Sequence, residues 1–289
     1  MTTHHLETDQ ATLAYDVRGA LPPADGRPPL LMIGQPMTAD GFATLASHFA
    51  DRTVVTYDPR GLGRSTRTDG TSTQTPQQQA EDLHALIEAI GSAPVDIFAS
   101  SGGAVSALAL VARYPHDVAT LVAHEPPIIP VLPDAELAFA AERAWQKTYQ
   151  EKGSGWGMAQ FMSATMWRGE FTDAYLSQPP PDPAQFGMSP DDDGSRDDPL
   201  LAGVANAVTS YQPDTEAIQA TPTRVVIAVG VESQGTFTGR TSESVAKALD
   251  LPLTEFPSHH GGFLGDERGY GGQPEAFAER LRQVLDGAR

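Results

Sequence analysis

The chain has 289 residues, of which 40% are apolar and 19% are charged, so it is long enough for one large core domain with an inserted subdomain. Its net charge of −18 argues against a nucleic-acid partner or an anionic membrane surface. The absence of cysteine excludes a thiol nucleophile, a disulfide framework and a Cys-ligated metal.

The sequence shows no targeting or membrane-spanning segment. No apolar run approaches the roughly 20 residues that a bilayer-crossing helix needs. The first seven residues have neither the basic region nor the apolar region of a signal peptide. We therefore expect a cytoplasmic protein without a membrane partner.

Short apolar strands alternate with helical patterns over most of the chain. A leading hairpin is predicted over residues 6–8 and 13–15. Buried strands are predicted at 29–33, 53–57, 95–99, 118–123, 224–229 and 253–256, and helices at 41–50, 77–90, 102–114, 242–249 and 275–285. Continuous apolar strands joined by helices predict an α/β fold, with a mostly parallel central sheet and helices on both faces.

The alternation of strands and helices stops between residues 127 and 220. Prolines open this stretch, helical patterns follow at 135–150 and 159–166, and residues 177–199 are rich in Pro and Asp without periodicity. We therefore predict a helical cap, or lid, over 127–220. The core domain would then consist of residues 1–126 and 221–289.

The junction between the third predicted strand and the helix after it carries the clearest chemical signal. Ser101 has Ala99 two residues before it and Gly103 two residues after it, which is the small-x-Ser-x-small pattern of a nucleophile elbow. A strained turn that lifts a hydroxyl clear of the sheet tolerates no bulky residue at these positions. Ser100 does not fit, because Phe98 would then occupy a small-residue position.

These motifs resemble those of the α/β-hydrolase family, in particular its serine esterases and cofactor-free haloperoxidases, and the resemblance extends over nearly the whole chain. Residues 58–65 closely match the family's Asp-x-Arg-Gly-x-Gly-x-Ser loop, to which we assign a structural role. Residues 31–36 stand where the family has a strand followed by His-Gly-x-Pro, with Ile33 in place of the His. The resemblance implies an oxyanion hole made by the backbone N–H groups of Gln35 and Gly102.

The resemblance also implies a general base near the C-terminus and an acid that orients it. His260 follows Pro257 by three residues and precedes two glycines, as the family's histidine does, and His259 is then a neighbour that contacts solvent or the pocket. For the acid we favour Glu232, which follows the strand predicted at 224–229. Glu125, which follows the preceding core strand, is the alternative, because some family members carry their acid there.

The predicted activity is that of a serine hydrolase. Ser101 would attack a carbonyl, His260 would take its proton, and water would release the acyl-enzyme. Aromatic and methionine side chains crowd part of the cap and the segment after Gln35, which favours a small-to-medium apolar ester or lactone as the substrate. The predicted pocket residues are Met37 and Phe42 after Gln35 and, in the cap, Trp156, Phe161, Met162 and Trp167. For the cap residues, packing onto the core is the other role that the sequence leaves open. We expect no cofactor and no metal, and the sequence is compatible with a homodimer.

Other functions remain open at this point. Ile33 in place of the family's His is a small hint of different chemistry on the same fold, such as a lyase, a perhydrolase or a C–C-cleaving enzyme. A receptor that binds a ligand through the same residues is a second alternative. A nucleotide-binding Rossmann protein is disfavoured, because no Gly-x-Gly-x-x-Gly run follows the first buried strand.

Overall fold

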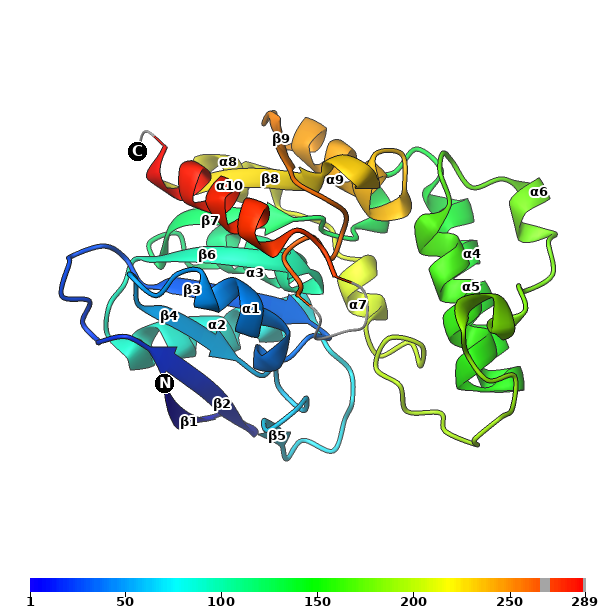
Figure 1. The fold of residues 1–289 in the computed structure, drawn as a ribbon, viewed down its shortest axis with the longest axis horizontal. Coiled ribbons are helices and arrows are strands. Elements are labelled where there is room, and N and C mark those ends of the chain that lie inside the picture. The colour runs from blue at the N-terminus through cyan, green and yellow to red at the C-terminus, as the bar shows by residue number, and fades with distance from the viewer. Residues whose placement is uncertain (266–270, 288–289) are drawn as a thin grey trace.

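The computed structural model describes residues 1–265 and 271–287, and this part of the chain forms one sheet of nine strands (Figure 1). The strands are β1 (Thr2–Thr8), β2 (Ala11–Arg18), β3 (Leu30–Gln35), β4 (Val54–Tyr57), β5 (Thr66–Arg67), β6 (Val95–Ser101), β7 (Val118–His124), β8 (Arg224–Gly230) and β9 (Leu253–Phe256). Their order is β1-β2-β4-β3-β6-β7-β8-β9, with β5 paired to β2. The strands from β4 to β9 along this order are parallel, and β1 and β2 form the predicted leading hairpin. The mostly parallel α/β sheet is therefore confirmed.

Helices cover both faces of this sheet, as predicted. They are α1 (Ala43–Ser47), α2 (Pro76–Ile90), α3 (Gly102–Arg113), α9 (Phe237–Ala248) and α10 (Pro274–Asp286). Buried residues of α2, α3 and α9 form one core cluster with one face of the strands, whereas those of α1 and α10 form a second cluster with the other face. In Figure 1, α1 and α10 lie in front of the sheet and α2 and α3 lie behind it.

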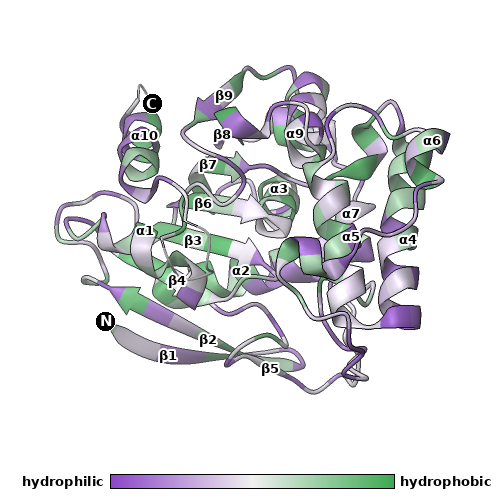
Figure 2. Cartoon of the chain, turned by 45° about the vertical axis from the view of Figure 1, so that its right-hand side comes forward, coloured by the Kyte–Doolittle hydropathy of each residue, from purple (hydrophilic) through white to green (hydrophobic). Residues whose placement is uncertain are grey.

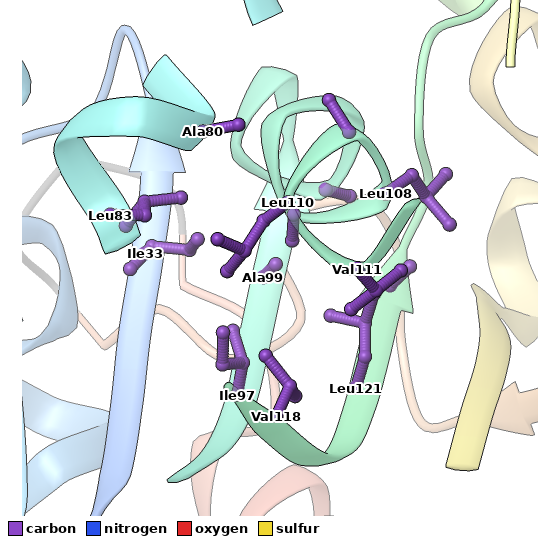
Figure 3. Close-up of a cluster of buried hydrophobic side chains, with 14 of the residues drawn as sticks. Ile33, Ala80, Leu83, Ile97, Ala99, Leu108, Leu110, Val111, Val118 and Leu121 are labelled. Atoms are coloured by element: carbon purple, nitrogen blue, oxygen red, sulfur yellow. The ribbon is translucent and has the colours of Figure 1, made fainter. Parts of the chain in front are cut away.

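Side chains of β6 alternate between the two clusters, because successive residues of a strand point to opposite faces. Ile97 and Ala99 face α3, as Figure 3 shows, and Phe98 faces α10. Both sides are therefore apolar, which explains the continuous hydrophobic run of this strand. Figure 2 shows the same pattern, with β3 predominantly hydrophobic and the edge strand β1 mostly not.

A mainly helical lobe stands between β7 and β8. Its elements are η2 (Ile129–Val131), α4 (Ala135–Lys152), α5 (Ser154–Met166), α6 (Asp173–Leu176) and η3 (Pro183–Phe186), and Figure 1 shows it at the end of the molecule beyond α7. Buried residues such as Trp145, Tyr149 and Ala164 give the lobe its own hydrophobic cluster. This separate cluster stabilises the helices of the lobe as a subdomain beside the core domain.

The last part of the predicted cap packs on the main core. Val208 lies in α7 (Asn206–Thr209), Tyr211 follows it, and Ile218 lies in α8 (Thr215–Ala220); all three belong to the cluster that contains α2 and α3. Within the predicted cap, the lobe's cluster extends no further than Ala202, and outside it the cluster includes Phe237 of α9. The predicted range 127–220 therefore includes a return segment that lies against the sheet's helices.

The loop between α5 and α6 ties the lobe to the loop after β8. Arg168 Nη2 donates to the main-chain oxygen of Glu232 at 2.9 Å, and Gly169 N donates to Gly235 O at 2.8 Å. Arg240 of α9 is ion-paired with the buried Asp134, and its Nη1 donates to Gly169 O at 2.9 Å. These contacts hold the lobe over the carboxyl edge of the sheet.

Residues 1–265 and 271–287 contain neither a candidate membrane-spanning helix nor a candidate metal-binding cluster. Within those ranges, no helix combines the length and the apolar composition that a bilayer crossing requires. The same residues contain no group of three His, Asp or Glu side chains placed to hold a metal ion.

Candidate active site

Ser101 occupies a strained turn between β6 and α3. It has φ +57° and ψ −128°, in a region that residues other than glycine seldom adopt, and it directly precedes the first residue of α3. A Cβ on Gly103 would lie 2.7 Å from Gly34 Cα, so the turn can approach β3 only because this residue has no side chain. The small residue at position 103 therefore allows the close packing of the turn on β3, as the motif predicted.

The two predicted oxyanion-hole residues lie side by side. Gln35, the last residue of β3, is paired in register with Ser101. A Cβ on Gly102 would lie 2.9 Å from Gln35 O and 3.1 Å from Gln35 Cβ. Gly102 also begins α3, whose first N–H groups have no partner inside the helix and carry the positive end of its dipole.

A buried carboxylate meets His260. The Nδ1 atom of His260 lies 2.7 Å from Glu125 Oε2, and because a carboxylate only accepts, this nitrogen carries the proton. Glu125 also accepts from Thr238 Oγ1 at 2.5 Å and from Gly230 N at 2.9 Å. The Glu125 side chain is 0% exposed and that of His260 is 38% exposed, so the imidazole is fixed on one side and open on the other.

The partners of Glu125 keep it ionised. Burial by itself would raise the pKa of this carboxyl, but the charge and hydrogen bond of His260, together with Thr238, outweigh burial and hold the pKa well below its ordinary value. Glu125 also has φ +50°, so the chain turns sharply directly after β7. The charge is thus held at a fixed place beside the imidazole.

Glu232, our first choice for the orienting acid, is not the carboxylate that contacts His260. The chain leaves β8 through the 3₁₀ turn η4 (Val231–Ser233), and Glu232 is exposed on it. Its main-chain N–H donates to Ser258 O at 3.0 Å, so it supports the turn before His260 only through its backbone. Glu125 was the alternative, and its signal in the sequence is a carboxylate that directly follows the strand next to the nucleophile's strand.

Ser101 and His260 both belong to the carboxyl edge of the parallel sheet. Adjacent parallel strands β6, β7 and β8 bring Ser101, Glu125 and Gly230 to this edge, and Gly230 is packed against the turn that contains Ser258 and His259. Over the described ranges no hydrogen bond joins Ser101 to His260. Such bonds are often long in enzymes without substrate and tighten when it binds.

Comparison with known proteins agrees with the fold. Residues 28–156 match the family model of the alpha/beta hydrolase fold. The chain has the α/β-hydrolase fold. It is 29% identical over 286 residues to the uncharacterized hydrolase YraK of Bacillus subtilis (strain 168), a match that covers 97% of this chain and 95% of YraK.

Solved structures share this fold over nearly the whole length of the chain. A thermophilic esterase from Thermogutta terrifontis superposes with a TM-score of 0.64 and 19% identity, covering 99% of this chain and 98% of the esterase. The enol-lactonase from Burkholderia xenovorans LB400 superposes with a TM-score of 0.62 and 15% identity, covering 98% of this chain and all of the lactonase. At these identities the similarity concerns the fold.

A fully buried histidine, His124, lies beside His260 and was not among the predicted site residues. It ends β7, and its Nδ1 lies 3.4 Å from Ser100 Oγ, while its ring stacks on that of His260 with centroids 6.1 Å apart. Its Nε2 lies 3.8 Å from Glu125 Oε1 and has no hydrogen-bond partner among the described residues. A cage of aromatic rings surrounds it, formed by Phe98, Phe256, Phe263 and Phe277.

Burial keeps His124 neutral. Desolvation lowers the pKa of this imidazole to about 4, although the nearby Glu125 carboxylate acts in the opposite direction. A neutral ring next to His260 adds no positive charge to the site. Its place at the strand end gave no sequence signal, because a histidine at such a position usually serves packing.

Two residues near Gln35 were predicted to line the pocket. Phe42 is instead completely buried, stacks on Phe263 with centroids 5.4 Å apart, and meets the edge of Phe98. Met37 is half-buried and packs against the same cluster. Phe42 is therefore a core residue, because the 3₁₀ turn that carries it faces α10 rather than the cap.

The predicted pocket residues of the cap make packing contacts. Phe161 meets Trp145 edge-on and Trp167 packs on Tyr175, with ring centroids 5.4 and 4.8 Å apart. The indole N–H of Trp156 donates to Pro190 O at 3.1 Å, and Met162 is half-buried. The contacts favour the packing role that was the alternative for these side chains.

His124→Phe should change how stability depends on pH. The folded-state pKa of His124 is depressed from 6.5 to about 4, so the unfolded chain takes up the proton first as the pH falls, and the neutral native state loses stability through this window. Relative to His124→Phe, the wild type should lose about 2 kcal/mol of unfolding free energy between pH 7 and pH 5, as measured by urea denaturation. Parallel stability curves for the two proteins would show that His124 titrates normally in the folded state.

Proposed function

We propose that this α/β-hydrolase is a serine hydrolase of esters or lactones in which Ser101, His260 and Glu125 form the catalytic triad. The observation that carries the proposal is the 2.7 Å contact between His260 Nδ1 and the buried carboxylate of Glu125, at the sheet edge where Ser101 occupies its strained turn. Along the chain the order is then Ser101, Glu125 and His260. Glu125 directly follows β7, the strand next to the one that ends at Ser101. Under this proposal Glu125 is the acid of the triad, and Glu232 supports the base only through its backbone.

Each member of the triad has a role that follows from its contacts. Glu125 holds the proton on Nδ1, which leaves the Nε2 lone pair of His260 to accept the proton of the Ser101 hydroxyl. Glu125 also stabilises the imidazolium that forms. The backbone N–H groups of Gln35 and Gly102 would bind the oxyanion, where each donor accounts for a rate factor on the order of 10²–10³.

The reaction then proceeds in two balanced halves. Ser101 Oγ forms a bond to the carbonyl carbon, and His260 passes the captured proton to the departing alkoxide, which leaves as an alcohol and gives an acyl-enzyme. Water next loses a proton to His260 and attacks the acyl carbon, and the proton returns to Ser101 as the acid is released. For a lactone, the alcohol stays attached to the acyl group.

The ester or lactone class draws support from proteins of the same fold. The similar structures include one named as an esterase and one named as an enol-lactonase. We propose a substrate of small-to-medium size, because the lobe of residues 129–202 stands over the carboxyl edge and is tied down through Arg168 and Arg240. Hydrolysis of an ester and hydrolysis of a lactone can both follow the acyl-enzyme route described above.

Ser101→Ala should abolish turnover of 4-nitrophenyl esters. The loss of kcat is expected to be on the order of 10⁶, because triad members act as a unit. A fluorophosphonate probe should modify Ser101 in the wild type and leave Ser101→Ala unmodified. Ser100→Ala is the matched control, since it removes the neighbouring hydroxyl and should keep the labelling. Full esterase activity in Ser101→Ala would contradict the proposal, and tight ligand binding without labelling would favour a receptor.

Glu125→Gln and Glu232→Gln should separate the two candidate acids. Glu125→Gln replaces an acceptor by an amide that cannot hold the same tautomer, and kcat should fall by a factor on the order of 10³–10⁴. Glu232→Gln changes an exposed side chain, and kcat should stay within about threefold of the wild type. Steady-state kinetics on one ester at pH 7 provides the comparison, and the reverse ranking would assign the acid to Glu232.

A further inference from the structure

The side chain of Gln35 has an unused hydrogen-bond donor. Only 5% of the residue is exposed, and its Oε1 accepts from Ser106 Oγ at 3.4 Å. Its Nε2 is buried and has no hydrogen-bond partner among the described residues. A buried polar atom without a partner costs free energy, so its presence in a native protein calls for an explanation.

The unused donor lies beside the predicted oxyanion hole. Gln35 is in register with Ser101, and its Cβ would be 3.1 Å from a Cβ on Gly102. Ser106, which holds the other end of the amide, also donates to Gly102 O at 3.2 Å. The Cγ1 atom of Val208 in α7 would lie 3.3 Å from the same Cβ on Gly102. The end of β3, the first turn of α3 and α7 therefore meet around Gly102, and the Gln35 amide contacts α3 through Ser106.

Two other buried glutamines of this protein are fully engaged. Gln79 Nε2 donates to Gln74 Oε1, and Gln74 Nε2 donates to Arg60 O at 2.7 Å. Gln79 Oε1 in turn accepts from Tyr57 OH at 3.2 Å. Against this comparison the open donor of Gln35 points to a ligand that supplies the missing acceptor.

We propose that the Gln35 side chain determines substrate specificity, by donating a hydrogen bond to an oxygen atom on the acyl part of the substrate. The inference rests on the proposed function, since the acyl group is placed by attack of Ser101. The backbone N–H of Gln35 and its side-chain amide would then bind two oxygens of one acyl group: the oxyanion and a hydroxyl or oxo group on the α or β carbon. The preferred substrates are hydroxyacyl or oxoacyl esters and lactones.

Simple alkyl acyl groups fit this place less well. They would leave Nε2 of Gln35 buried without a partner, and sites built to hydrogen-bond a substrate oxygen discriminate strongly against analogues that lack it. An acyl hydroxyl can both donate and accept, so it can also join the contact between Gln35 and Ser106. A pure alkyl chain can do neither.

The test compares two 4-nitrophenyl esters of equal chain length, butyrate and 3-hydroxybutyrate. We expect the wild type to favour the hydroxybutyrate, in kcat/KM, by roughly tenfold or more. Gln35→Met keeps the backbone N–H and the approximate volume but removes the amide, and should lower this preference by roughly tenfold. Gln79→Met, the matched control, removes a buried amide from the Tyr57 and Gln74 network and should leave the preference unchanged.

Every outcome decides the inference. If the wild type hydrolyses the two esters with equal kcat/KM and this activity depends on Ser101, the inference is overturned while the proposed function stands. This result does not depend on the folding of any Gln35 variant. An equal loss of preference in Gln35→Met and Gln79→Met also overturns it, because the effect would then be one of packing. If neither ester is hydrolysed in a Ser101-dependent manner, the proposed function fails and this inference fails with it. Thermal unfolding of both variants verifies that they are folded.

Discussion

The contact between the Glu125 carboxylate and His260 Nδ1 is the interaction on which the site depends. It joins the end of β7 to a loop 135 residues further along the chain, and water cannot compensate the charge of the fully buried Glu125. Thr238 and Gly230 supply further donors, so three segments meet at one carboxylate. A buried charge is tolerated only with such partners. The same contacts that hold the fold together here also fix the tautomer of the imidazole that we propose as the base.

The parallel sheet brings Ser101, Glu125 and His260 to the same edge. Neighbouring strands β3, β6, β7, β8 and β9 end at one edge. The segments that follow them therefore bring together the predicted oxyanion donors, the strained Ser101, the carboxylate and the turn after β9 that holds His260. Ligands of open α/β sheets bind at this edge for the same reason. The unused amide of Gln35 belongs to the same group, because it ends β3 beside Ser101. Gln35 would thus contribute to substrate specificity through its side chain and to catalysis through its backbone N–H.

Much of this could be predicted from the sequence, and the limits have physical causes. The alternation of apolar strands and helices predicted the sheet, and the small residues around Ser101 predicted its turn, because both signals are local. The acid depends on strand register: His124 pairs with Ala228, which places Glu125 beside Gly230, while Glu232 turns outward on η4. No local pattern distinguishes these two outcomes. Apolar residues such as Phe42 likewise give no sign of whether they pack in a core or line a pocket.

The Nδ1 proton of His260 gives the most direct test of the central contact. A proton held between an imidazole and a carboxylate at 2.7 Å exchanges slowly and should give a far-downfield resonance in the proton NMR spectrum of the wild type. We predict that this resonance persists in Glu232→Gln and disappears in Glu125→Gln, with both variants folded. A resonance that survives in Glu125→Gln and is lost in Glu232→Gln would contradict the assignment of Glu125 as the partner of His260.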